Sequence, residues 1–212
     1  MSEDSVGGLE DLAQAKQTIA EQKREIERLR RRLDDERLAE ELRDALVLAA
    51  TTGAIAAPSQ HSRLLESIVE TAARVIPSEA ASLFLIDAQA QELVFEVALG
   101  QKAEEVKKFR VPLGHGFAGL VAVSGQPMTA SDVESDSRHA SDIAQLIGYS
   151  PKSILCCPLV YNDQVVGVLE LLDRRGASSF SPADIDTLWM FANQAAIALE
   201  QSRTYRNLAQ II

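Results

Sequence analysis

The segment Leu9–Glu41 contains neither glycine nor proline and is rich in strong helix formers, so it predicts one long uninterrupted helix. Apolar residues recur at every seventh position: Leu12, Ile19, Ile26 and Leu33. The second column of this heptad pattern is mixed, with Leu29 as its long apolar member. β-Branched residues in one column and leucine in the other favour a parallel two-stranded coiled coil. We therefore expect a homodimeric coil over residues 9–41, after a flexible start at 1–8.

A solvated single helix is the alternative for this segment, but a lone helix with nothing to pack against is marginal in water. The heptad register changes near residue 35, where the apolar positions shift to Leu38 and Leu42. The arginines of residues 28–32 are interleaved with acidic residues, which indicates a solvated coil face. The whole chain has a net charge of −10, which argues against nucleic acid as a partner.

The remaining composition is that of a globular protein, with 46% hydrophobic and 25% charged residues. No apolar run approaches the roughly 20 residues that cross a bilayer, and the acidic N-terminus lacks the apolar core of a secretory signal. The only two cysteines are adjacent, which provides neither a disulfide framework nor a metal cluster. These features predict a cytoplasmic protein with no membrane partner.

Beyond the coil, two helices are followed by a change to the two-residue period of strands. Strands are expected at Ala81–Asp87, Glu92–Ala98, Ser153–Tyr161 and Val165–Asp173. Ser181, Pro182 and Asp184 mark the start of a final helix that continues toward residue 212. The order predicts an α+β fold, an antiparallel sheet with helices on one face.

Three stretches carry a resemblance to a known family: ASLFLID, VPLGHGFAGLVAVSGQPMTASDVESD and SILCCPLVYNDQVVGVLELLDRRGASSFSPADIDTL. They run in the order and at the spacing of a GAF domain, the sensory module related to the PAS fold. The chain resembles that family over residues 42–200, with 201–212 as a signalling extension of the last helix. The resemblance implies a small-molecule sensor whose flanking helices dimerise and pass a signal to a downstream protein or output domain.

The ligand pocket implied by the resemblance lies between the sheet and the segment from 117 to 147. Its candidate lining residues are Phe84, His115, Phe117, His139, Ile143, Ile147 and Cys156. The alternative is a ligand-free scaffold for dimerisation and partner docking, in which apolar side chains fill this space. The cofactor is unknown, with cyclic nucleotide or haem as further alternatives; the histidines also fit exposed loop positions, and no metal site is expected.

Cyclic-nucleotide-binding GAF domains carry Asn-Lys, a later Phe, and then Asp-Glu. The matching residues here are Asp173, Arg174, Phe180 and Asp184, with Ile185 in place of the glutamate. The resemblance implies that these residues form a structural brace that includes an Arg174–Asp184 ion pair.

No catalytic constellation is found, so we expect that the chain is not an enzyme. Gly114–Gly119 matches the dinucleotide fingerprint literally, but it lacks the strand and βαβ context and indicates a tight turn instead. Cys156 and Cys157 fall on one strand and therefore point to opposite faces. Bilin-binding GAF domains use a Cys-His pair that is absent here, and GAF-type methionine sulfoxide reductases place a cysteine where this chain has Ala118.

Apolar residues continue at helical spacing through residues 203–212, beyond the end of the domain. Apolar side chains on a projecting helix favour a partner that covers them. We therefore expect Leu199 and Leu208 to extend the dimer seam, or this helix to lead into an output domain.

Overall fold

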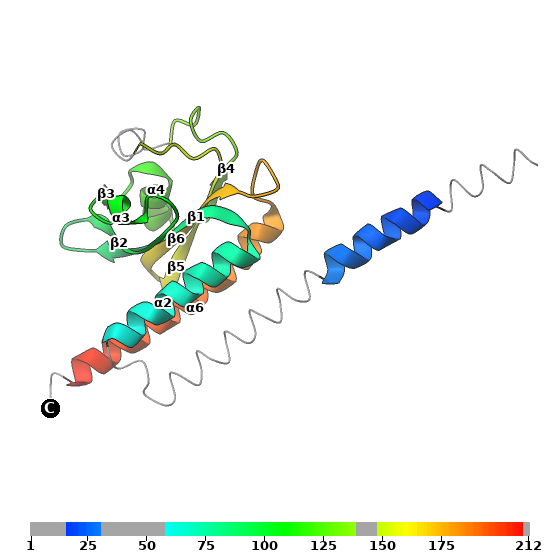
Figure 1. Cartoon of the computed structure of the whole chain (residues 1–212). Helices are drawn as coiled ribbons and strands as arrows, with labels where there is room; N and C mark the ends of the chain where they lie inside the picture. The colour runs from blue at the N-terminus through cyan, green and yellow to red at the C-terminus, as the bar shows by residue number, and fades with distance from the viewer. Residues whose placement is uncertain (1–15, 31–57, 139–147, 210–212) are drawn as a thin grey trace, which may run out of the picture. The chain divides into compact units, whose positions relative to one another are not determined.

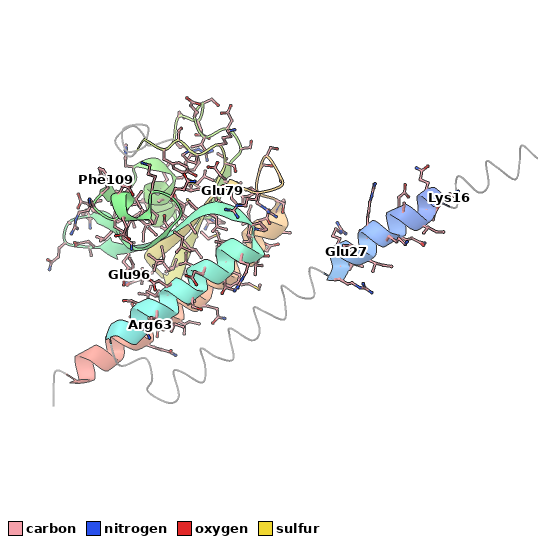
Figure 2. All side chains as sticks on the ribbon, viewed as in Figure 1. Lys16, Glu27, Arg63, Glu79, Glu96 and Phe109 are labelled. Atoms are coloured by element: carbon pink, nitrogen blue, oxygen red, sulfur yellow. The ribbon has the colours of Figure 1, made fainter. Side chains whose placement is uncertain are left out.

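The computed structural model describes residues 16–30, 58–138 and 148–209, and the side chains of 16–30, 62–138 and 148–201. The chain divides into two units, Met1–Arg43 and Asp44–Ile212. In the first unit, residues 16–30 form one helix whose side chains are all exposed, as Lys16 and Glu27 illustrate in Figure 2. The exposed side chains include Ile19, Ile26 and Leu29 of the predicted seam. Leu12, Leu33 and the register change near residue 35 lie outside the described residues.

The second unit is built on a six-stranded sheet in which every neighbouring pair of strands is antiparallel, in the order β3-β2-β1-β6-β5-β4. The strands are β1 (Ser78–Asp87), β2 (Glu92–Leu99), β3 (Arg110–Pro112), β4 (Met128–Ala130), β5 (Ile154–Tyr161) and β6 (Gln164–Arg174). The helices are α2 (Pro58–Val75), α3 (Ala103–Val106), α4 (Gly116–Ser124) and α6 (Pro182–Ala209).

Helices α2 and α6 lie side by side on one face of the sheet, although they come from opposite ends of the domain (Figure 1). The α2 residues Leu65, Ile68, Val69 and Ala72 form a fully buried stripe at helical spacing. Helix α6 begins with a reciprocal capping box. The Asp184 backbone N–H donates to Ser181 Oγ at 3.2 Å, and the Ser181 N–H donates to Asp184 Oδ2 at 2.8 Å.

The other face of the sheet is covered by α4, which corrects the prediction that all helices lie on one face. Phe117 and Val121 of α4 are buried in a cluster with Phe84 of β1 and Val168 of β6. The physical reason lies in β5, whose residues from Ile154 to Leu159 are all buried. A strand buried on both faces needs a layer on each side, and it appears in sequence as a continuous apolar run rather than an alternation.

The glycine-rich turn before α4 lets this helix approach the sheet closely. Gly114 and Gly116 have φ of +82° and +64°, a conformation that glycine adopts without steric cost. A β-carbon on Gly119 would lie 2.6 Å from the Pro112 carbonyl oxygen. The motif therefore acts as a tight turn, as its sequence context predicts.

Strands β3 and β4 were not predicted, because each has only three residues and too few alternating positions to form a pattern. Among the residues that the structure describes, no helix is both long and apolar enough to cross a membrane.

Candidate functional site

A cavity of about 150 Å³ lies where the start of β1, the end of β2 and the end of β6 meet α3. Its apolar wall includes Leu99, Val106 and Leu172, and its polar residues include Ser82 and Tyr149. Ser82 is two residues from Phe84 on β1, and Leu172 is four residues from Val168 on β6, so all four side chains lie on the same face of the sheet. The cavity therefore opens on the face that α4 covers.

Asp173 closes one side of this cavity and holds the segment that follows residue 147. Its carboxylate accepts hydrogen bonds from the Tyr149 hydroxyl and from the backbone N–H groups of Lys152, at 2.6 Å, and Ser153, at 3.3 Å. Burial and the neighbouring Asp173 carboxylate raise the pKa of Tyr149, so its phenol remains a donor. Asp173 has φ of +55°, which is uncommon for a residue other than glycine.

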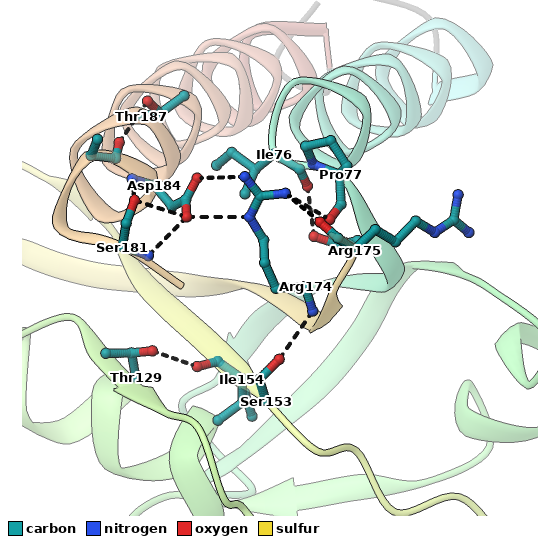
Figure 3. Close-up of polar contacts among 12 residues, drawn as sticks. Ile76, Pro77, Thr129, Ser153, Ile154, Arg174, Arg175, Ser181, Asp184 and Thr187 are labelled. Atoms are coloured by element: carbon teal, nitrogen blue, oxygen red, sulfur yellow. Dashed lines mark hydrogen bonds and ion pairs between the residues drawn. The ribbon is translucent and has the colours of Figure 1, made fainter. Parts of the chain in front are cut away.

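The next residue, Arg174, turns to the opposite face and ties both long helices to the end of β6 (Figure 3). Its Nε and Nη2 lie 3.2 and 3.3 Å from the two carboxylate oxygens of Asp184 at the start of α6. Its Nη1 donates to the carbonyl oxygen of Pro77, just after α2, at 3.3 Å. Phe180, which lies between Arg174 and Asp184 in the sequence, is buried. Three of the four brace residues thus surround the helix ends, whereas Asp173 contacts the cavity side.

A buried polar group, Glu170, lies on β6 two residues before the lining residue Leu172, although it does not itself line the cavity. Glu170 is opposite Ser82 on β1 and Cys156 on β5, and it is only 9% exposed. The Cys156 thiol contacts Glu170 Oε2 at 3.4 Å. Burial raises the pKa of Glu170 to about 7.

The two cysteines face opposite sides of the sheet, and neither has the environment of a reactive thiol. Burial and then the Glu170 charge raise the pKa of Cys156, and burial raises the pKa of Cys157 to about 12. Cys157 Sγ lies 3.9 Å from the Ile185 carbonyl oxygen on α6. Reactive cysteines are thiolates in electropositive, partly exposed places, so both thiols act as small apolar core groups. In the described residues, no group of three or more His, Cys, Asp or Glu side chains is arranged to hold a metal.

A family model for the GAF domain matches residues 60–199, well over half of the chain. The chain belongs to the GAF domain family.

The chain is similar to parts of two 3′,5′-cyclic nucleotide phosphodiesterases. The chain is 29% identical over 147 residues to a probable 3′,5′-cyclic phosphodiesterase, pde-5, of Caenorhabditis elegans, covering 65% of this chain and 20% of the relative. It is 26% identical over 156 residues to dual 3′,5′-cyclic-AMP and -GMP phosphodiesterase 11 of Drosophila melanogaster, covering 67% of this chain and 11% of the relative. The chain therefore spans a fifth or less of these relatives.

Solved GAF domains share the fold. That of a phosphoenolpyruvate-protein phosphotransferase from Coxiella burnetii has a TM-score of 0.61 and 22% identity, covering 78% of this chain and 96% of that one. The GAF-B domain of DevS from Mycobacterium smegmatis has a TM-score of 0.56 and 21% identity, covering 70% and 98%.

Four of the predicted pocket residues of this GAF domain lie in the part of the chain that the structure describes, and they do not line the cavity. Phe84, Phe117 and Cys156 are buried together in the cluster between the sheet and α4. His115 is the N-cap residue of α4. Its backbone is extended, and its side chain makes no capping hydrogen bond. None of these four residues lines the cavity described above. His139, Ile143 and Ile147 lie outside the described residues.

Sequence reasoning missed Tyr149, Ser82 and Glu170. Glu170 carried a usable signal, since it is the one acidic residue within the apolar run from Val165 to Leu172. A charged residue inside a strand buried on both faces is costly, and such residues concentrate at functional sites. Tyr149 follows Gly148 in a polar stretch, and its contact with Asp173 is too distant in sequence to be read from a pattern.

The raised pKa of Glu170 predicts how the stability of the domain depends on pH. The folded state holds the Glu170 proton to about pH 7, whereas the unfolded chain releases it near the ordinary value of 4.5. Glu170 therefore stabilises the fold below about pH 4.5, and this contribution is lost as the pH rises through about 7. The loss amounts to roughly 3 kcal/mol.

Glu170→Gln removes this titration. The free energy of unfolding of the variant, relative to that of the unmodified chain, should therefore be more favourable at pH 8 than at pH 5. Urea unfolding at both pH values measures the difference, and Glu66→Gln on the exposed side of α2 is the control. Parallel pH profiles for Glu170→Gln and the unmodified chain would contradict the assignment.

Proposed function

We propose that this chain is a dimeric sensory module, in which a GAF domain binds a small molecule and passes the event to its flanking helices. Family membership and the likeness to the DevS GAF-B domain support a regulatory role. The chain spans a fifth or less of the two phosphodiesterases that it matches, so their catalytic activity is not assigned to it. We propose that it acts in the cytoplasm and that its partner is a downstream signalling protein or an output domain.

One observation carries the proposal. Asp173 lines the cavity, and the adjacent Arg174 contacts Asp184 of α6 and the Pro77 carbonyl that follows α2. Both helices that leave the domain are thus attached to the residue next to the cavity wall. A ligand that changes the Asp173 contacts changes the position of Arg174, and a conformational signal needs such a physical connection between the site and the moving element.

The exposed apolar side chains of two helices support the dimer. Ile19 and Ile26 are exposed seven residues apart on the 16–30 helix. On α6, Met190 and Ile197 are 47% and 44% exposed, also seven residues apart. This differs from the predicted seam, because Leu199 is 1% exposed and packs inside its own domain. The side chain of Leu208 lies outside the described residues. A second copy of the chain would cover both apolar stripes.

Charges placed in the predicted seam should weaken the dimer. Replacing Ile26 and Leu29 with lysine introduces two like charges per chain at positions that face the partner. We expect the dimer to dissociate at micromolar concentration, as measured by sedimentation velocity. Gln17→Lys with Ala20→Lys adds the same charge outside the seam and should leave the dimer intact.

Two outcomes would redirect this proposal. A dimer that is unchanged by the seam variant would assign association to the GAF body or to α6, which Met190→Lys with Ile197→Lys then tests. An unmodified chain that remains monomeric at tens of micromolar would overturn the dimeric module. Native mass spectrometry of protein purified from its own host reports the stoichiometry and any retained small molecule together.

A ligand-free scaffold is a second candidate, favoured by the packing beneath α4. Phe84 and Phe117 are almost fully buried and share one apolar cluster, and the rings of Phe84 and Phe95 lie 4.3 Å apart. This packing of described side chains beside α4 supports the scaffold. A retained ligand in native mass spectrometry argues against the scaffold, and a ligand-free dimer from the native host supports it.

A further inference from the structure

The size of the cavity limits the ligand to a small molecule. A volume of about 150 Å³ is similar to that of engineered protein cavities that bind benzene. A cyclic nucleotide, with a base, a ribose and a phosphate, is far larger. The part of the ligand that enters is therefore one small ring or a short apolar chain with a single polar group.

Two buried polar side chains at this end of the sheet, Ser82 and Glu170, have few hydrogen-bond partners among the described residues. Ser82 lines the cavity and is 6% exposed, and the described residues offer its hydroxyl no hydrogen-bond partner. Its cross-strand neighbour Glu170 contacts one weak donor, the Cys156 thiol. A carboxylate has about four acceptor positions, and leaving a buried acceptor unsatisfied destabilises the fold. A ligand that donates hydrogen bonds at this point would remove that cost.

The charges around the cavity also favour a donor that is positively charged. The carboxylates of Glu79 and Asp173 both line the cavity, and Glu170 lies opposite the lining residue Ser82. Besides burial and the Asp173 hydrogen bond, these three carboxylates raise the pKa of Tyr149. Two cations are already paired in the part of the chain that the structure describes: Lys102, which itself lines the cavity, and Arg175, two residues beyond the lining residue Asp173. Lys102 lies 3.7 Å from Glu105, and Arg175 lies 2.8 Å from Glu79. An anionic ligand would meet these carboxylates, and each of the two cations already has a carboxylate partner.

We propose that this cavity binds a small organic cation, a protonated amine or amidine on a compact apolar group. Its N–H groups donate to Ser82 Oγ, and Glu170 supplies the opposing charge from the adjacent strand. The apolar part packs against Leu99, Val106 and Leu172. This assignment rests on the small-molecule role proposed above and gives that role a ligand class.

Three probes of similar shape and different charge test the proposal: benzylamine, benzyl alcohol and benzoate. Binding to the full chain is followed at pH 7.5 by isothermal titration calorimetry and by chemical-shift changes. We expect benzylamine to bind saturably at millimolar concentration or below, at least tenfold more tightly than benzyl alcohol, and benzoate not to bind.

Two variants locate the site. Ser82→Ala and Glu170→Gln should each weaken benzylamine binding at least fivefold, whereas Glu66→Gln, which removes an exposed carboxylate of α2, should not. Because the two variants alter different strands, a folding defect in one leaves the other as a test. Circular dichroism of each variant verifies its fold.

The possible failures are distinguishable. Benzoate or benzyl alcohol binding as tightly as benzylamine would overturn the cation assignment and leave a small-molecule role in place. Benzylamine binding that is equal in Ser82→Ala, Glu170→Gln and Glu66→Gln would place it outside this cavity and also overturn the proposal. If none of the three probes binds, the cavity is not a site for this class. The dimer measurement and the native ligand search use no probe, so they judge the proposed function separately.

Discussion

Gly167→Ala should destabilise the domain by about 3 kcal/mol or more, or prevent soluble expression, although it adds a single methyl group. Gly167 lies in the central strand β6, and a β-carbon there would be 2.2 Å from the Phe84 carbonyl oxygen of β1. The clash is with backbone, so no side-chain rotation relieves it. The two strands would have to separate at the middle of the sheet. Thermal and urea unfolding followed by circular dichroism measure the loss.

Gly176→Asn is the matched control at a glycine with open surroundings. Gly176 has φ of +76°, a β-carbon added there would have no atom within 4 Å, and asparagine tolerates the left-handed region. We expect a cost below about 1 kcal/mol. Equal stability of Gly167→Ala and the unmodified chain would mean that β1 and β6 adjust more freely than a packed sheet allows.

Phe180→Ala should cost about 3–5 kcal/mol, the usual range for removing a buried aromatic side chain. Phe180 is 5% exposed and immediately precedes the Ser181 cap of α6, so its loss also loosens the start of that helix. Differential scanning calorimetry measures the change. An unmoved melting temperature would show that Phe180 does not anchor the helix.

The neighbouring ion pair serves as a second measurement in the same region. The Arg174 and Asp184 side chains are only 19% and 14% exposed, so the pair is mostly buried. Removing one partner of a buried pair leaves an uncompensated charge, which typically costs about 3–5 kcal/mol. Because Ser181 also donates to Asp184, we expect Arg174→Ala to cost about 2–3 kcal/mol, and Arg174→Lys somewhat less. A loss below about 0.5 kcal/mol for Arg174→Ala would show that the pair is solvated.

The sequence predicted most of the sheet because its long strands have clear patterns. The stretches ASLFLID and VVGVLELLD lie within β1 and β6, and the capping residues Ser181 and Asp184 located the start of α6. The α4 layer was placed less well. Consecutive apolar residues in β5 indicate burial on both faces, but they do not say which helix supplies the second layer.

The candidate site was harder to predict, because a pocket wall and a packed core use the same residue types. Phe84 and Phe117 fit either role by sequence, and in the structure both are buried in one apolar cluster. The family resemblance grouped Asp173 and Arg174 in one structural brace. In the structure the two side chains lie on different sides of the sheet, as successive residues of a strand do, so Asp173 contacts the cavity side and Arg174 contacts the helices.

The left-handed backbone at Asp173 lies between the cavity and the ends of α2 and α6, so a change at the helices is also felt at the cavity. This conformation costs about 1–2 kcal/mol for a residue other than glycine, and the hydrogen bonds to Tyr149, Lys152 and Ser153 hold it in place. Thermodynamic linkage is reciprocal. If a ligand shifts the equilibrium position of Arg174 and the helix ends, then holding those ends in one position changes the ligand affinity by the same factor. A partner that grips α2 and α6 would thereby set the sensitivity of the domain, and the same GAF domain in two assemblies would respond at two different ligand concentrations.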